Sequence, residues 1–253
     1  MEFFKKLKAL NVFDYIFVLL EIIILSIMII FQIKTITNCS DLVKYAQLYY
    51  PGVKICKIFL IGLPFLWIVS YFISHIIDDK HKIGDFKNLM IIYVLLGLSA
   101  NIFTLTMENY PLISMSIFLG SYLLLGLALI KDSKEIYIHV IALILFLSLA
   151  LVISSLRSPI GIIASLCAGL LVSNLILTIF KYVQTKNKYY LYFLIGIAFA
   201  LISDVSLGLR SVVSNNVLNN IVSFIVWPTY VISLIMLIFG YNIYHQSLDI
   251  KEN

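Results

Sequence analysis

The amino-acid sequence predicts an all-α protein: a polytopic membrane helix bundle with eight transmembrane helices in one domain, 1–253, and both termini in the cytoplasm. Hydrophobic residues make up 62% of the chain and charged residues 12%, against about 45–50% and about 25% in soluble proteins. Long apolar stretches recur along the chain, and Lys and Arg are spread unequally between the connectors. A soluble domain of this length still exposes a large surface, so we expect the bilayer to be its solvent.

Eight stretches have the length of about 20 mostly apolar residues that crosses a bilayer as a helix. The first is too long for the apolar core of a signal peptide and is followed by no small-residue cleavage site, so we expect it to be a retained span. The connectors are short, except for 34–57, which we expect to be a loop with a short interfacial segment. The eight expected spans are 15–33, 58–77, 89–106, 110–130, 136–154, 159–180, 189–209 and 221–243.

The basic residues predict the orientation of the chain, because cytoplasmic connectors are enriched in Lys and Arg. With the amino terminus inside, twelve of the 18 basic residues lie on the inner side. The net charge of +5 therefore indicates orientation rather than nucleic-acid binding, and no nucleic-acid-binding motif is present. Frequent Ile, Lys and Asn are typical of AT-rich bacterial genomes, so we expect a bacterial cytoplasmic membrane. The outer side keeps Lys34, Lys44, Lys54, Lys57, Arg157 and Arg210.

Several cofactor-dependent chemistries are excluded by what the sequence lacks. Cys39, Cys56 and Cys167 form no spacing typical of a metal site, so we expect no metal and no cofactor. No Lys lies in the middle of a span, where a Schiff base would need it, and the HExxH motif of zinc proteases is absent. Cys39 and Cys56 share one connector, which leaves a disulfide open, although we favour free thiols.

One carboxyl group, Asp204, stands out among the polar residues within the spans. Ionisable side chains at bilayer depth cost about 2.5–3.5 kcal/mol, so each is a candidate functional residue. Residues four apart share a helix face, which places Gly196, Ala200, Asp204 and Gly208 in one stripe of small residues. Such a stripe permits close helix packing or leaves room for a ligand. Asp204 is therefore either a structural hydrogen-bonding group between helices or the centre of a site.

The other polar residues within the spans have structural interpretations as well. Glu21 is either a proton or cation site or a carboxyl that pairs across helices or extends to the interface. Asn174 is expected to hydrogen-bond between helices. His75 and His139 lie near predicted inner helix ends, where we expect them to be solvated.

Two segments near the carboxyl end resemble a known family. "GIAFALISDVSLGLR", followed by "WPTYVISLIMLI", is similar to the closing spans of the lysoplasmalogenase (YhhN) family, which carry a Gly-rich entry to a Ser-Asp pair and then a Thr-Tyr pair. The matching residues are Gly196, Ser203, Asp204, Thr229 and Tyr230. The family is also similar in size, span number and cytoplasmic termini. The resemblance covers residues 57–240, and its specific motifs cover about 40 residues.

The resemblance implies a lipid substrate and an acid–base reaction. Family members cleave the vinyl ether bond of lysoplasmalogens, which requires protonation of carbon and attack of water on the resulting cation. A carboxyl in apolar surroundings can hold the required proton near neutral pH. Asp204 would be the acid, Asn101 and Ser203 would orient water, and Tyr230 would line the pocket. Thr229, Gly196, Ala200 and Gly208 would shape it, and Arg210 or Arg157 would bind the lipid phosphate.

The sequence also departs from the family pattern. Ala100 and Asn101 stand where the family has a Gly-Asp pair, and an amide cannot act as a general acid or base. Ala128 stands in place of a family His, and Ser233 in place of a Gln. Glu108, two turns after Asn101, could replace the missing carboxylate, but we favour a solvated Glu there. The chain is therefore either a diverged hydrolase or a protein that only binds the lipid.

A second hypothesis comes from a different class of protein. A small non-catalytic transporter or membrane-embedded binding subunit would use Glu21 or Asp204 as a proton or cation site. Both hypotheses need Asp204, so the sequence does not separate them.

Overall fold

The computed structural model describes residues 12–37, 42–78, 86–106, 111–130, 132–153, 156–212 and 216–252. This part of the chain is helical apart from short connectors and contains no strand, which confirms the all-α class for these residues. The elements are α2 (Val12–Thr37), α3 (Leu42–Asp78), α4 (Phe86–Thr106), α5 (Pro111–Leu129), η3 (Ser133–Glu135), α6 (Ile136–Val152), α7 (Pro159–Thr185), α8 (Lys188–Val212) and α9 (Asn216–Glu252).

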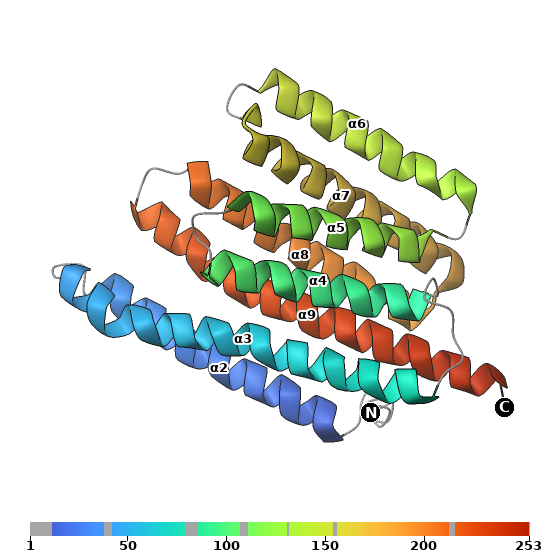
Figure 1. Ribbon diagram of the computed structural model, residues 1–253, viewed down its shortest axis with the longest axis horizontal. Coiled ribbons are helices and arrows are strands. Elements are labelled where there is room, and N and C mark those ends of the chain that lie inside the picture. The colour runs from blue at the N-terminus through green and yellow to red at the C-terminus, as the bar shows by residue number, and fades with distance from the viewer. Residues whose placement is uncertain are drawn as a thin grey trace.

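The long helices lie side by side in two packed rows, and successive helices are antiparallel (Figure 1). One row is formed by α3, α4 and α5, and the other by α2, α9, α8 and α7, with α6 packed on the outside of α7. The closest association is between α8 and α9, and α4 lies against both α5 and α9. Because successive helices alternate in direction, α2 begins and α9 ends at the same end of the bundle.

Seven helices of the described chain are long and apolar enough to cross a membrane. The remaining expected span, 89–106, which is the third along the chain, corresponds to α4, whose apolar stretch among the described residues, Leu89–Thr104, is shorter. By length and composition these are the helices of a polytopic membrane bundle. The seven stretches are Asp14–Lys34, Pro51–Val69, Leu112–Leu129, Ser133–Val152, Pro159–Thr185, Lys188–Leu207 and Phe224–Tyr244.

The expected loop at 34–57 is largely helical, which corrects the prediction. α3 begins at Leu42, continues through Pro51 and Pro64 and ends at Asp78, so it contains the expected span 58–77; among the described residues its apolar stretch is Pro51–Val69. Proline lacks an N–H and usually ends a helix in water, but membrane helices tolerate it. Cys39 lies outside the described residues, and so does the predicted choice between a disulfide with Cys56 and free thiols.

The buried face of α2 carries its acidic residues. Asp14, Glu21 and Met28 are buried at intervals of seven residues, which is two helical turns. The opposite side is formed by exposed apolar residues such as Leu19 and Ile23. This pattern, with carboxyls inside and aliphatic side chains outside, suits a helix whose outer face contacts lipid.

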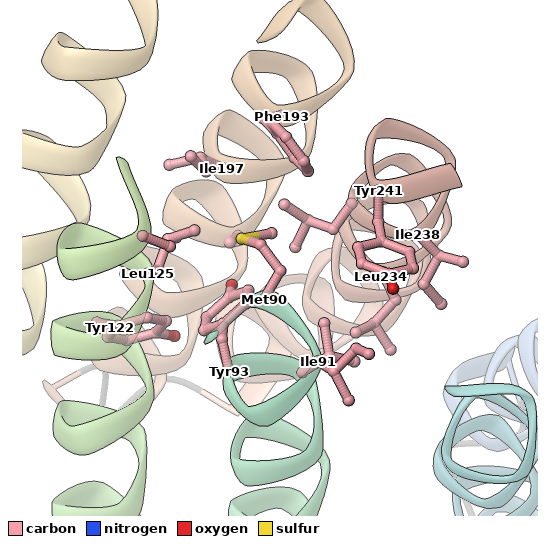
Figure 2. Close-up of a cluster of buried hydrophobic side chains, with 14 of the residues drawn as sticks. Met90, Ile91, Tyr93, Tyr122, Leu125, Phe193, Ile197, Leu234, Ile238 and Tyr241 are labelled. Atoms are coloured by element: carbon pink, nitrogen blue, oxygen red, sulfur yellow. The ribbon is translucent and has the colours of Figure 1, made fainter. Parts of the chain in front are cut away.

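The main apolar core includes residues of α3 and α7 as well, and Figure 2 shows the part of it where α4, α5, α8 and α9 meet. Met90 and Ile91 of α4, Leu125 of α5, Phe193 of α8 and Ile238 of α9 are buried there. A Cβ on Gly196 would lie 2.8 Å from Cγ of Leu237, and one on Gly240 would lie 2.8 Å from Cδ1 of Phe193. These glycines allow α8 and α9 to approach closely.

Candidate polar pocket between α4, α5, α8 and α9

A cavity of about 60 Å³ lies among the same four helices. Its polar lining consists of Tyr93 and Asn101 from α4, Ser121 and Tyr122 from α5, Ser203 and Asp204 from α8, and Tyr230 and Ser233 from α9. The walls are otherwise apolar, with Phe118, Ala200 and Trp227 among them. Asp204 and Asn101 are near the carboxyl ends of α8 and α4, so the pocket lies in the half of the bundle away from the start of α2.

Asp204 is held by a tyrosine from the neighbouring row. The hydroxyl of Tyr122 donates a hydrogen bond of 2.7 Å to Oδ2 of Asp204. Tyr122 is itself buried, and its ring packs against Phe118 and Tyr93. In Figure 2, Tyr122 and Tyr93 come from α5 and α4 and border the apolar core. The carboxyl group is thus fixed at one oxygen and borders the cavity.

Asn101 is oriented by two hydrogen bonds. Its Nδ2 donates to the carbonyl of Gly97, one turn earlier, and to the hydroxyl of Tyr230, both at 2.9 Å. Both amide hydrogens are therefore used, and the carbonyl oxygen is the atom that can accept a hydrogen bond from a ligand or water. The amide orients groups in the pocket, but it cannot exchange protons with them.

The hydroxyl groups of Ser203 and Thr229 bind backbone carbonyls. Ser203 Oγ donates to the carbonyl of Val226 at 3.1 Å and so links α8 to α9. It can still accept a hydrogen bond on the pocket side. Thr229 bonds the carbonyls of Ile225 and Val226 in its own helix and does not line the cavity. The expectation that Thr229 shapes the pocket is therefore not met.

The small-residue stripe serves two purposes. Ala200 lines the cavity, whereas Gly196 lies against Leu237 and permits packing. The side chain of Arg210, the environment of Gly208 and residue Glu108 lie outside the described part of the chain. Arg157 does not line the pocket: its Nε donates to the carbonyl of Leu151 at the junction of α6 and α7.

The volume of the cavity limits what it can hold. A water molecule needs about 10–15 Å³ of such space, so about 60 Å³ accommodates several waters or one small polar group. A fatty chain does not fit within this volume. A chain-bearing ligand would place only its polar end in this cavity.

A second polar cluster, which the sequence did not predict, lies between α6 and α7. His139 is 7% exposed, and its Nδ1 lies 2.6 Å from Oγ of Ser173. The expectation that His139 is solvated is therefore wrong. Asn174 is fully buried and donates from Nδ2 to the backbone carbonyl of Tyr122, as expected for a residue that joins helices.

Neither structural interpretation of Glu21, extension to the interface or pairing across helices, fits the described residues. Its side chain is 1% exposed, so it does not extend to the interface. Both carboxyl oxygens lack a hydrogen-bond partner among the described residues, so it does not pair across helices there.

No group of three or more His, Cys, Asp or Glu residues that could hold a metal ion occurs in the described segments. The fold and the pocket together define a polytopic helical membrane protein with a small, carboxyl-bearing internal cavity. Comparisons with family models, curated proteins and solved structures found no match.

Proposed function

We propose that this is a lysoplasmalogenase-like protein of the bacterial cytoplasmic membrane, with eight spans and cytoplasmic termini, that hydrolyses the vinyl ether of a single-chain phospholipid or binds that lipid. The observation that supports this most directly is the shared cavity of Asp204, Asn101, Ser203 and Tyr230. These residues come from three helices, and the resemblance assigns the reaction to the same set.

The chemistry needs a positioned acid and a positioned water. Asp204 would protonate the vinyl carbon, while its other oxygen stays hydrogen-bonded to Tyr122. Water held by the carbonyl oxygen of Asn101 and by Ser203 would attack the resulting cation and return a proton to Asp204. The hemiacetal formed would break down to a fatty aldehyde and a glycerophospho-headgroup. No metal or cofactor is required for these steps.

The direct experiment is to incubate the purified protein with a lysoplasmalogen in lipid nanodiscs and measure the aldehyde released. We expect wild type to release aldehyde and Asp204→Asn to lower the rate by about 10²–10⁴-fold, the usual contribution of a positioned acid. Tyr137→Phe, at an exposed tyrosine of α6 far from the cavity, is the matched control and should not change the rate.

Asn101→Asp tests whether the absence of a second carboxylate at this position is all that prevents hydrolysis. If wild type and Asn101→Asp both release no aldehyde, hydrolysis is rejected for this chain. Binding of a labelled lysolipid, weakened by Tyr230→Ala but not by Tyr137→Phe, would then support the binding form of the proposal. Neither aldehyde nor binding would reject it entirely.

A further inference from the structure

Two buried polar atoms on α6 and α7 have no hydrogen-bond partner among the described residues. They are Nε2 of His139 and Oδ1 of Asn174. His139 is 7% exposed and Asn174 is fully buried, so neither atom reaches the surroundings of the bundle. Buried polar atoms of folded proteins are nearly always hydrogen-bonded, and where no protein group does so an ordered water usually does.

The two atoms border the same place, beside Gly126 of α5. A Cβ on Gly126 would lie 3.0 Å from Oδ1 of Asn174 and 3.3 Å from Nε2 of His139. Both atoms therefore converge on one side of this glycine, although they come from two other helices. Any other residue at position 126 would place its Cβ against both atoms, whereas glycine allows a small molecule to approach them.

The neighbouring hydrogen bonds make both atoms acceptors. Ser173 Oγ donates its proton to the carbonyl of Leu170 at 2.8 Å, so Nδ1 of His139, 2.6 Å from that oxygen, is the donor to Ser173. A neutral imidazole with its proton on Nδ1 accepts at Nε2. Nδ2 of Asn174 donates to the carbonyl of Tyr122 at 3.0 Å, which fixes the amide with Oδ1 as the remaining acceptor.

A second proton on the imidazole would not satisfy the pair. Nε2 of His139 and Oδ1 of Asn174 form no hydrogen bond with each other, so an added N–H would not reach the amide. Glu135, one turn before His139, is already paired with Lys181 of α7. A buried charge without its own partner costs much more than a buried neutral group. The pair therefore calls for a separate molecule that donates two hydrogen bonds.

We propose that Nε2 of His139 and Oδ1 of Asn174 bind one buried water molecule, which donates a hydrogen bond to each. Water is small, and its two protons match the two acceptors. The bound water links α6 to α7 beside Gly126 and fixes the amide of Asn174. That amide holds the carbonyl of Tyr122, which lines the polar pocket. This site goes beyond the proposed function and does not depend on it.

Solid-state NMR of the full chain in lipid, with nitrogen-15-labelled histidine, tests the water site without any substrate. We expect Nε2 of His139 to be unprotonated and to receive magnetisation from a water proton. A protonated Nε2 would overturn the proposal, because the atom would then be a donor. An unprotonated Nε2 that receives no magnetisation from water would overturn it as well. Sequential assignment identifies the His139 ring in wild type, so this test needs no variant.

Gly126→Ala tests the position of the water. The added methyl group would occupy the approach to both acceptors, so we expect the transfer from water to Nε2 of His139 to be lost. Gly120→Ala on the same helix is the matched control, since its Cβ would meet nothing within 4 Å, and it should retain the transfer. Full transfer in Gly126→Ala would overturn the placement beside this glycine. If that variant does not fold, the wild-type spectrum still decides whether the water is bound.

Discussion

The hydroxyl of Tyr122 on α5 donates a 2.7 Å hydrogen bond to Oδ2 of Asp204 on α8. This bond crosses between the two rows of helices, at a place where both side chains border the polar cavity. It fixes the direction of the one carboxyl group that lines the cavity. The backbone of Tyr122 is held as well, because its carbonyl accepts from Nδ2 of Asn174 on α7. Three helices are thus linked at a single tyrosine.

Removal of this hydrogen bond should lower stability measurably. We expect Tyr122→Phe to reduce the free energy of unfolding by about 1–3 kcal/mol, since it leaves a partly buried carboxyl without its donor. Unfolding in SDS-containing mixed micelles measures this change. In a double-mutant cycle with Asp204→Ala, the two losses should not add. Additive losses would show that the two side chains do not interact in the folded protein.

The fold class was predictable from the sequence because long apolar stretches are a strong signal. The start of α3 was not, since the Pro-Gly pair at 51–52 is typical of a loop, whereas the helix continues through Pro51. Thr229 was misplaced for a simpler reason. It is next to Tyr230, which lines the cavity, but its hydroxyl bonds the carbonyls of Ile225 and Val226 in its own helix.

The pocket itself was predictable only in part. Asp204 and Ala200 share a helix face, and Asn101, Ser203 and Tyr230 followed from the family resemblance. Tyr122 was missed because the chain has 16 tyrosines and no periodicity indicates which one faces a carboxyl on another helix. His139 was misjudged because its distance from a helix end does not reveal that α7 covers it.

The close approach of α8 and α9 should depend on Gly196. We expect Gly196→Ala to cost about 1–3 kcal/mol, because the added Cβ would lie 2.8 Å from Cγ and 3.2 Å from the backbone N of Leu237. Gly120→Ala in α5 is the matched control, since its Cβ would meet nothing within 4 Å. That variant should be neutral or gain about 0.5–1 kcal/mol from helix propensity. Equal losses in both variants would contradict tight packing at Gly196.

The ion pair between Lys181 and Glu135 should anchor η3 to α7. Lys181 Nζ lies 2.5 Å from Oε1 of Glu135, with side-chain exposures of 6% and 22%. We expect Lys181→Met to lower the free energy of unfolding by about 1–3 kcal/mol, less than for a fully buried pair, because Glu135 keeps some exposure. Lys134→Met, at an exposed neighbour, should change it by less than about 0.5 kcal/mol. Restoration of stability by adding Glu135→Gln to Lys181→Met would confirm that the loss comes from the charge of Glu135 once its lysine is removed.

The hydrogen bond between His139 and Ser173 has a defined direction, which makes it testable. Ser173 Oγ donates its only proton to the carbonyl of Leu170 at 2.8 Å, so Nδ1 of His139 must carry a proton and donate to Ser173. We expect Ser173→Ala to cost about 1–3 kcal/mol, because it leaves this buried N–H without an acceptor. Ser148→Ala is the control, since that exposed serine of α6 bonds only the carbonyl of Ile144 in its own helix. Nitrogen-15 spectra of the wild-type imidazole should show Nδ1 protonated, and a bare Nδ1 would contradict this assignment.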